Sequence, residues 1–509
     1  MTAFCLTASG SHTPEKPVSK YWILFNTKDV ARAPALSAAA LTRRTSQGLA
    51  IDETDLPLSG ICLKALHDAG IEPLCQSRWL NGVSAMLSEA QINQLRQLAF
   101  VKAIQPIDSR IKIMSTGLRD DAAKPHLAPV MSQIQAGDFA KAGLTGRFVT
   151  IGVVDAGFFA ADSADALKHI FERKGVRQVR DYVHPNETKH NLFRTMETMS
   201  DLHGTEVLAA IAGQDPRENL QYGLATDATF YLARTDQGNR EYRGEEDNWV
   251  QAMEWLDSLG VRIVNTSLGY ARGFSNPKEN YETREMDGKT SLISRAAQIA
   301  ADKKGMLIIV SAGNEGEDRN WRIISTPADA QGVLSVGATN SKLWNRIGYS
   351  SIGPEALPYM KPNVSCFSLY GTSLSAPVIT GFAACLMQAN PKLTNKELIE
   401  IIEKSSHLYP YGNNYVGYGV PQASRALALL RKQPLPATTR SIKASGKTVQ
   451  VPVSSGEALA SVFHKKDNMH VLTQEAAKII NGKVTLKRLS NERQTTVDLK
   501  QEVIEVIWE

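Results

Sequence analysis

Short runs of apolar and β-branched residues alternate with helical segments over residues 131–430. The runs are FVTIGVVD, TFYLART, VRIVNTSLG, MLIIVSAGN and VLSVGAT. Strands that are apolar at nearly every position are typical of parallel sheets, because helices cover both faces and neither face meets water. The pattern therefore predicts an α/β domain in which a parallel sheet lies between two layers of helices.

A smaller unit precedes this domain. The run YWILF and the later runs GVSAML and VKAIQPI predict strands. Between the last two runs, residues 89–98 have apolar side chains at helical spacing, and Ser88 before them is a suitable N-cap. These patterns predict a small α+β domain over residues 20–112. The polar stretch 113–130 predicts a linker.

The two ends of the chain differ from both domains. Residues 431–509 are rich in Lys, Val and Thr and alternate in runs such as KVTLKRL and TTVDLK, which predicts a β-rich module. Three roles stay open for this module: a sorting domain, a substrate-binding module or a stabilising cap. Residues 1–19 predict the remainder of a leader or a disordered end, because their apolar stretch is short and lacks a basic region before it. Either the chain is cytosolic, or its numbering starts late and an export signal is missing.

Composition changes this picture only a little. A chain of 509 residues is too long for one hydrophobic core, and 43% hydrophobic with 21% charged residues describe an ordinary globular protein. A net charge of +5 is too small to indicate a nucleic-acid partner. No apolar run reaches the ~18–20 residues that a membrane span needs. Five cysteines form neither a disulfide framework nor a metal-ligand spacing; Cys62 and Cys75 are near enough in sequence to pair, but buried free thiols are commoner.

Four polar side chains stand at the ends of predicted strands or helices. Asp155 ends the strand VTIGVVD, where open α/β sheets place their ligands. His203, in DLHGTEV, opens an apolar helical run, and Ser373, in GTSLSAPVITGFAACLM, opens another whose Pro377 is expected in the first turn. Asn314 follows the strand in IIVSAGNEG and has an amide that could donate to an oxyanion. Taken alone, each is more ordinary as a turn residue, a helix cap or an exposed histidine.

The segments around these residues occur in a fixed order: VVDAGF, HGTEV, NTSLG, SAGNEG and GTSLSAP. Asp155 and His203 are 48 residues apart, and His203 and Ser373 are 170 apart. In this order the five motifs resemble the signatures of the subtilase family, over about residues 144–430. The stretch from YWILF through SRWLNGVSAMLSEAQINQL looks like the inhibitory propeptides of bacterial secreted subtilases. The resemblance implies a subtilisin-like parallel sheet behind a propeptide domain.

The resemblance also implies the mechanism of a serine endopeptidase. His203, oriented by Asp155, would take the proton of the Ser373 hydroxyl as that oxygen attacks a peptide carbonyl. Asn314 and the backbone N–H of Ser373 would stabilise the oxyanion. Two extended edges would pair with the substrate backbone. Their residues are Ser267, Leu268, Gly269, Ser311, Ala312 and Gly313.

The implied partners are protein or peptide substrates and the chain's own propeptide, which would act as an intramolecular inhibitor. A cut between residues 108 and 130 would release it, although a permanent accessory domain is the alternative. The chemistry requires no cofactor; structural calcium is frequent in the family, but no contiguous group of oxygen ligands predicts a site here, so no metal ligand is assigned. Because this branch of the family is exported, the resemblance implies a secreted or periplasmic enzyme.

Four features depart from the family pattern. Leu374 replaces a methionine of similar volume, Glu206 stands where many relatives have a second histidine, and Asn363 replaces an aspartate. Only seven residues separate Asn363 from Gly371, a short loop that could reshape the cleft or loosen the site. Two other functions stay open: a pseudoenzyme that binds peptides without cutting them, and an esterase that uses the same residues. A pseudoenzyme would normally have lost one of the four polar residues.

Overall fold

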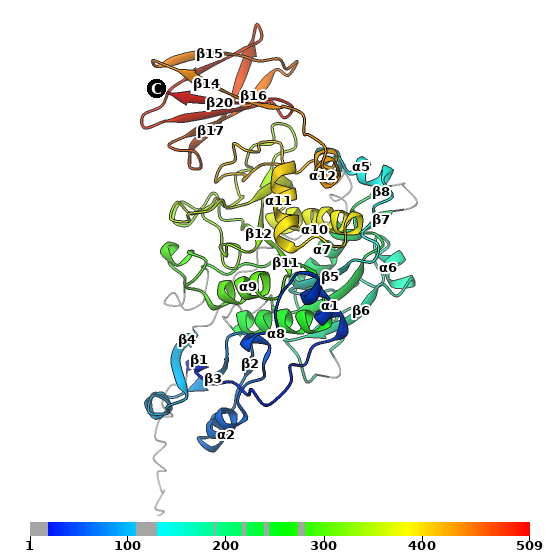
Figure 1. The fold of residues 1–509 in the computed structure, drawn as a ribbon, viewed down its shortest axis with the longest axis vertical. Coiled ribbons are helices and arrows are strands. Elements are labelled where there is room, and N and C mark those ends of the chain that lie inside the picture. The colour runs from blue at the N-terminus through cyan, green and yellow to red at the C-terminus, as the bar shows by residue number, and fades with distance from the viewer. Residues whose placement is uncertain (1–18, 108–129, 188–189, 216–219, 239–243, 273–279) are drawn as a thin grey trace, which may run out of the picture.

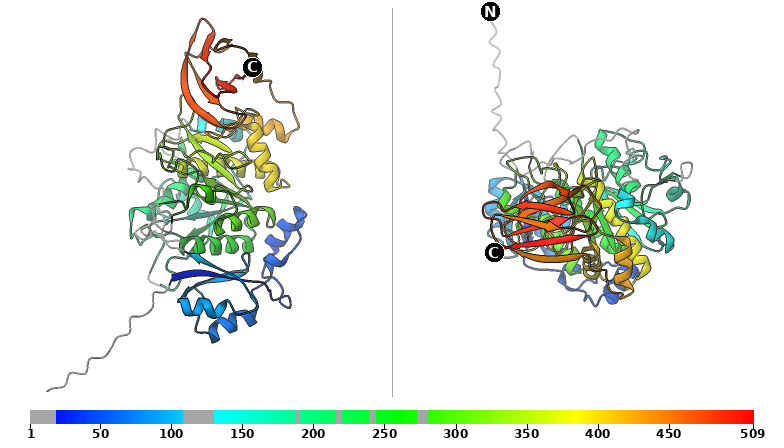
Figure 2. Two further views of the ribbon diagram at one scale, coloured as in Figure 1. Left: turned by 90° about the vertical axis from the view of Figure 1, so that its left-hand side faces the viewer. Right: turned by 90° about the horizontal axis from the view of Figure 1, so that it is seen from above.

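The computed structural model describes residues 19–107, 130–187, 190–215, 220–238, 244–272 and 280–509. Three parts follow one another along the long axis of the molecule (Figure 1). The α+β domain lies at one end, the α/β domain in the middle and the β-rich module at the other end, and the left-hand view of Figure 2 shows the same order. Of the predicted leader and the predicted linker, only Ser19 and Val130 belong to the described residues.

A seven-stranded parallel sheet forms the centre of the α/β domain, in the order β13-β12-β11-β10-β5-β9-β6. The chain enters the sheet at β5, places β6 and β9 on one side and β10 to β13 on the other, and so reverses its strand order between β5 and β10. Open α/β sheets bind ligands beyond the carboxyl ends of the strands at such a point. The strands are β5 (Thr150–Asp155), β6 (Val176–Asp181), β9 (Thr229–Arg234), β10 (Ile263–Thr266), β11 (Leu307–Ser311), β12 (Leu334–Thr339) and β13 (Val364–Phe367).

Helices cover both faces of this sheet, which confirms the predicted architecture. One face packs against α7 (His203–Ala212), α10 (Thr372–Ala389) and α11 (Asn395–Ser405). The other face packs against α8 (Gly244–Leu259) and α9 (Leu292–Asp302). The remaining elements of the domain are α5 (Ala136–Lys141), α6 (Lys168–Glu172), α12 (Ala423–Leu430), the 3-10 helices η3 (Met199–Leu202) and η5 (Thr283–Glu285), and the paired strands β7 (Gln214–Asp215) and β8 (Leu220–Gln221).

The helix that carries Ser373 begins earlier than the sequence predicted. α10 starts at Thr372, so Pro377 lies in its second turn, and the prediction that it lies in the first turn was wrong. A proline there has no N–H to donate to the carbonyl four residues before it, which is that of Ser373. Gly371 precedes the helix with a φ of 129°, a conformation that residues with a Cβ rarely adopt.

The amino-terminal domain is an antiparallel sheet of order β2-β3-β1-β4 with helices on it. The predicted strand-helix-strand unit is confirmed, and Ser88 accepts a hydrogen bond from the N–H of Gln91 as the N-cap of its helix. An arm formed by α1 and η1 leaves the sheet and lies against the α/β domain (Figure 1). The elements are β1 (Ser19–Phe25), α1 (Ala38–Ser46), η1 (Glu53–Asp55), α2 (Gly60–Asp68), β2 (Cys75–Ser77), β3 (Gly82–Leu87), α3 (Glu89–Leu95) and β4 (Val101–Ile107).

The carboxyl-terminal module is β-rich, as predicted, with seven strands in the order β14-β20-β19-β16-β17-β18-β15. Alternating burial along β18, with every second residue buried, matches the alternation seen in the sequence. The strands are β14 (Thr439–Ala444), β15 (Thr448–Pro452), β16 (Leu459–Lys465), β17 (Val471–Ile480), β18 (Lys483–Lys487), β19 (Gln494–Asp498) and β20 (Val503–Trp508).

The described cysteines are buried free thiols, so Cys62 and Cys75 do not pair. Within the described residues, α10 is the one helix long and apolar enough to cross a membrane, and most of its surface is buried in the core beneath the sheet.

Candidate active site

Asp155 and His203 form the first half of the candidate site. Asp155 is the last residue of β5 and His203 the first of α7, and both are buried. Asp155 Oδ1 lies 2.6 Å from His203 Nδ1 in a hydrogen bond and also accepts from the N–H of Ala156 at 2.8 Å. A Cβ on Gly204 would overlap the carbonyl oxygen of Gly157 and lie 3.0 Å from Asp155 Cβ. The glycine therefore permits the close approach of the strand end to the helix start.

The surroundings of His203 favour its protonated form. Burial alone would lower the pKa of His203, because an imidazolium is costly away from water. The charge and hydrogen bond of Asp155, together with the carboxylates of Glu206 and Asp236, outweigh burial and raise the pKa above its ordinary value. Nε2 of the same ring is buried without a hydrogen-bond partner among the described residues. An imidazole held at Nδ1 and open at Nε2 can serve as a general base.

Ser373 and Asn314 form the second half of the site. Asn314 Oδ1 accepts from the N–H of Thr372 at 2.9 Å and from its hydroxyl at 3.0 Å, which fixes the orientation of the amide. A Cβ placed on Gly371 would lie 3.0 Å from Asn314 Nδ2 and 3.1 Å from Ser373 Oγ. The amide donor and the hydroxyl therefore face one small space that a glycine leaves open. A carbonyl attacked there by Ser373 would have its oxygen beside the Asn314 amide.

The two halves lie on helices that pack together, because α7 and α10 contact each other on one face of the sheet. His203 opens α7, and Ser373 lies in the first turn of α10. The amino terminus of α10 places partial positive charge near Ser373, where an oxyanion would form. Catalytic hydrogen bonds of a free enzyme are often long and tighten when substrate binds, so the open Nε2 is compatible with a later bond to Ser373.

The carbonyl of Ser373 links α10 to the SLG segment, residues 267–269. Pro377 cannot donate to this carbonyl, and the Ser267 hydroxyl donates to it instead, at 2.8 Å. Ser267 Oγ in turn accepts from Asn265 Nδ2 at 3.0 Å, while Thr380 donates to Asn265 Oδ1 at 2.8 Å. The carbonyl that Pro377 leaves without a helical donor thus holds Ser267, the start of the first predicted substrate edge, next to the backbone of Ser373.

The second predicted edge, residues 311–313, has three backbone groups engaged within the protein. The N–H of Ala312 donates to Val336 O at 2.9 Å, and the N–H of Gly313 donates to the Thr372 hydroxyl at 3.0 Å. The carbonyl of Gly313 accepts from the N–H of Ser351 at 2.9 Å. These three bonds fix the chain immediately before Asn314.

Two departures from the family pattern have local explanations. Asn363 Oδ1 accepts from the N–H of Ser335 at 2.9 Å, while Nδ2 donates to Glu403 at 2.8 Å, which an aspartate could not do. The short loop before Gly371 is closed by the Ser368 hydroxyl, which donates to Gly371 O at 2.7 Å. The short loop is therefore fixed at its end rather than loose.

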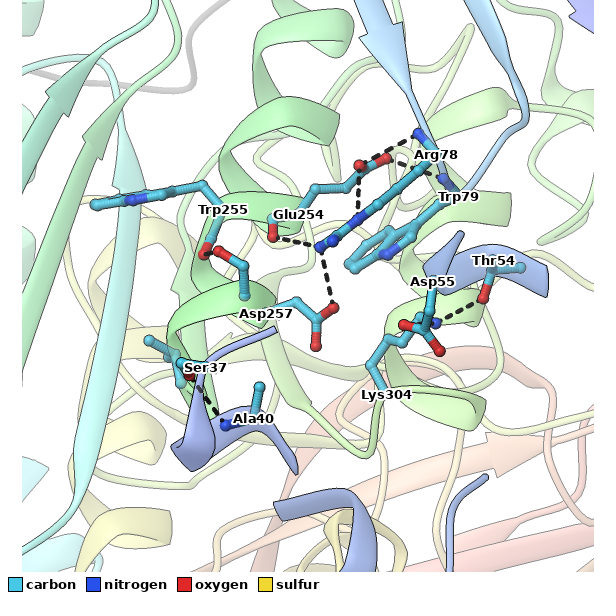
Figure 3. Close-up of polar contacts among 12 residues, drawn as sticks. Ser37, Ala40, Thr54, Asp55, Arg78, Trp79, Glu254, Trp255, Asp257 and Lys304 are labelled. Carbon is cyan, nitrogen blue, oxygen red and sulfur yellow. Dashed lines mark hydrogen bonds and ion pairs between the residues drawn. The ribbon is translucent and has the colours of Figure 1, made fainter. Parts of the chain in front are cut away.

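Sequence reasoning missed the way the amino-terminal domain is attached to α8. Glu254 accepts from the Ser77 hydroxyl at 2.6 Å and from the N–H of Trp79 at 3.1 Å. Figure 3 shows the Arg78 side chain lying along this carboxylate and also reaching Asp257, one turn further on. Burial raises the pKa of Glu254, although the charge of Arg78 acts against this. The contact combines a buried carboxylate with donors from a neighbouring domain.

Asp257 is the second centre of this attachment. Its carboxylate pairs with Arg43 and Arg44 of the arm, and all three side chains are almost completely buried. Arg44 also pairs with Asp55 of the arm, to which Lys304 of the α/β domain donates at 2.8 Å (Figure 3). The sequence shows only that segments expected to pack carry charged residues. It does not show which of them pair, because the partners are far apart along the chain.

Comparisons with known proteins agree with this geometry. The model of the subtilase family matches residues 146–419, and the model of the peptidase S8 propeptide domain of Bacteroidota matches residues 20–121. Subtilisin NAT of Bacillus subtilis subsp. natto is 26% identical over 363 residues, which are 68% of this chain and 80% of that protein. Subtilisin DY of Bacillus licheniformis is 29% identical over 208 residues, 38% of this chain and 67% of that protein.

Two solved structures share the fold. Fervidolysin from Fervidobacterium pennivorans, a keratinolytic enzyme, aligns with a TM-score of 0.54 and 18% identity over 95% of this chain and 71% of its own. The epidermin leader peptide processing serine protease of Staphylococcus aureus aligns with a TM-score of 0.53 and 16% identity over 82% of this chain and 100% of its own. Since the family model covers more than half of the sequence, the chain belongs to the subtilase family.

Proposed function

We propose that this serine endopeptidase, made as a zymogen with its propeptide in front, acts through Asp155, His203 and Ser373, with Asn314 in the oxyanion hole. The observation that carries the proposal is the shared space at Gly371, which Ser373 Oγ and Asn314 Nδ2 both face. His203 Nε2 takes the Ser373 proton as Oγ bonds to the peptide carbon. The oxyanion accepts from Asn314 and from the N–H of Ser373, and the protonated His203 then donates to the leaving amine.

Substrate would lie along residues 267–269 as an added strand. The Ser267 hydroxyl is fixed on the nucleophile's own carbonyl, so this segment has a constant position relative to Ser373. Residues 311–313 would then form a wall of the site, because both N–H groups of Ala312 and Gly313 and the carbonyl of Gly313 are bonded inward.

The propeptide would be removed by a cut between residues 108 and 130. That stretch joins β4, the last strand of the amino-terminal domain, to the α/β domain. Residues 108–129 lie outside the described residues. The relatives named subtilisins, and the match to a propeptide domain, favour an enzyme that acts outside the cytoplasm.

The test compares the full-length chain with Ser373→Ala by intact mass and by casein hydrolysis. We expect the natural chain to lose its amino-terminal part and digest casein, while Ser373→Ala loses activity on the order of 10⁶-fold and stays intact. Ser375→Ala, two residues along the same helix and equally buried, is the matched control and should process normally. Activity of the natural chain on small esters without any on casein would favour the esterase, and an inert natural chain would favour the pseudoenzyme.

A further inference from the structure

Two histidines and a glutamate converge in the segment between β6 and α7. One possible ligand atom from each of His184, His190 and Glu197 lies within 4.8 Å of those from the other two. His184 Nε2 is 3.0 Å from Glu197 Oε1, and the two imidazole rings lie 4.6 Å apart between their centres. The catalytic mechanism uses none of these residues.

The second nitrogen of each imidazole faces a carboxylate. His184 Nδ1 is hydrogen-bonded to Glu187 at 3.2 Å, and His190 Nδ1 lies 2.8 Å from Asp181 Oδ2. Asp181 is itself fixed, because its other oxygen accepts from the N–H of Val183 at 2.9 Å. A carboxylate at Nδ1 orients a histidine for metal binding through Nε2. Both rings therefore have the surroundings of metal ligands.

Two of the possible ligand residues, His190 and Glu197, already contact a cation, the guanidinium of Arg234. Arg234 is completely buried; its Nη1 donates to His190 Nε2 at 3.0 Å, and its Nη2 donates to Glu197 Oε2 at 2.8 Å. Because His190 Nε2 accepts this hydrogen bond, that nitrogen carries no proton of its own. Glu197 keeps its other oxygen, Oε1, on the His184 side. Arg234 faces the carboxylates of Asp181, Glu197 and Asp201, and a fourth carboxylate, that of Glu187, lies against His184, so the cluster has room for further positive charge.

We propose that His184, His190 and Glu197 bind a divalent transition-metal ion, Zn²⁺ by preference, which takes over the contact of Arg234 with His190. Two imidazole nitrogens and one carboxylate oxygen form a donor set that suits Zn²⁺, whereas Ca²⁺ and Mg²⁺ prefer oxygen alone. The site is near the catalytic residues in the chain: Glu197 is six residues before His203, and Arg234 also donates to the carbonyl of Ala156, beside Asp155, at 3.0 Å. Bound metal would tie the segment before α7 to the sheet edge.

The test uses the full-length Ser373→Ala chain, which stays intact and needs no activity. After removal of metal with a chelator, we expect it to bind one equivalent of Zn²⁺, to show the visible absorption of tetrahedral cobalt with Co²⁺, and to unfold at a higher temperature when Zn²⁺ is present. His190→Ala should weaken Zn²⁺ binding by roughly 100-fold or more. Glu187→Gln, an exposed change that keeps the fold, should weaken it by roughly 10-fold.

His67→Ala is the matched control. His67 forms a similar pair with Glu72 at 2.8 Å, but it is exposed on the amino-terminal domain and belongs to no group of three metal-ligating side chains among the described residues. It should leave Zn²⁺ binding unchanged. The proposal is overturned if the parent chain binds no stoichiometric Zn²⁺, or if Glu187→Gln and His190→Ala bind it as tightly as the His67→Ala chain does. Neither result bears on the role of Ser373, since the readouts are binding and stability.

Discussion

The α/β domain contacts its two neighbours through different kinds of interface. On the amino-terminal side, buried charges dominate: the carboxylates of Asp247, Glu254 and Asp257 each meet basic or hydroxyl groups of the other domain. On the carboxyl-terminal side an apolar cluster lies beside a buried ion pair, that of His407 with Asp498 at 3.1 Å, and beside backbone bonds such as that from the N–H of Asn414 to Met469 O at 2.9 Å. The apolar cluster consists of Leu408, Tyr415, Val416, Phe463, Val471 and Val503.

The difference matches what each neighbour has to do. Charged groups that separate are hydrated at once, and this hydration offsets much of the Coulomb energy lost. Apolar groups that separate are left in contact with water, and nothing offsets the loss. An interface of the first kind suits a propeptide, which leaves once, and one of the second kind suits a part that stays. We infer that, of the three roles open for the carboxyl-terminal module, a stabilising cap fits best.

The largest expected effect comes from breaking the charged interface at its centre. In the Ser373→Ala chain, Asp257→Ala leaves Arg43 and Arg44 buried without their shared carboxylate. Breaking a buried charge network in this way costs about 3–5 kcal/mol. We expect the amino-terminal domain to come off first in urea, with faster hydrogen exchange of the α1 amides.

Asp302→Ala is the control for this change. Asp302 forms an exposed pair with Lys396 on the same domain, and such pairs contribute about 0–1 kcal/mol. Equal losses of stability in the two variants would mean that the buried charges contribute no more than surface charges.

The apolar interface should fail differently. Leu408→Ala removes a completely buried side chain from the cluster and should cost about 2–5 kcal/mol. The expected result is faster proteolysis and hydrogen exchange in the carboxyl-terminal module alone, with a cost that stays the same at high salt, because no charge is removed. Leu472→Ala, at an exposed position of the same module, should change stability by less than about 0.5 kcal/mol. A salt-dependent cost in Leu408→Ala would contradict the comparison.

The sequence predicted those parts of the molecule that depend on short stretches of chain. Apolar runs predicted the strands of the parallel sheet, and Ser88 with the spacing after it predicted α3. The candidate site was predictable for the same reason, since Asp155 and His203 each stand at the end of one element.

The contacts between elements were not predictable in this way. Arg43 and Asp257 are 214 residues apart, and the periodicity of one helix says which face is buried but not which partner covers it. Pro377 was misplaced because the first turn of α10 begins before the apolar run does. Pro377 leaves the carbonyl of Ser373 to accept a bond from Ser267 instead. This bond joins two motifs that are far apart in the sequence, so the sequence did not predict it.

The smallest expected effect tests whether the active site is independent of both interfaces. Burial lowers the pKa of His203, whereas Asp155 and then Glu206 raise it. Glu206→Gln removes the second of these carboxylates. The pKa of His203 should therefore fall. Because the enzyme needs the neutral imidazole as a base, the acid limb of kcat/KM should move to lower pH, with little change on the plateau.

Leu408→Ala serves here as the control, since it alters docking of the carboxyl-terminal module without changing any charge near His203. Its acid limb should coincide with that of the natural enzyme, measured on the same peptide substrate after processing. If the limb of Glu206→Gln stays in place or moves to higher pH, His203 is not the titrating base. If instead the limb of Leu408→Ala moves, the module reaches the active site, and the division between a removable inhibitor and a passive cap has to be abandoned.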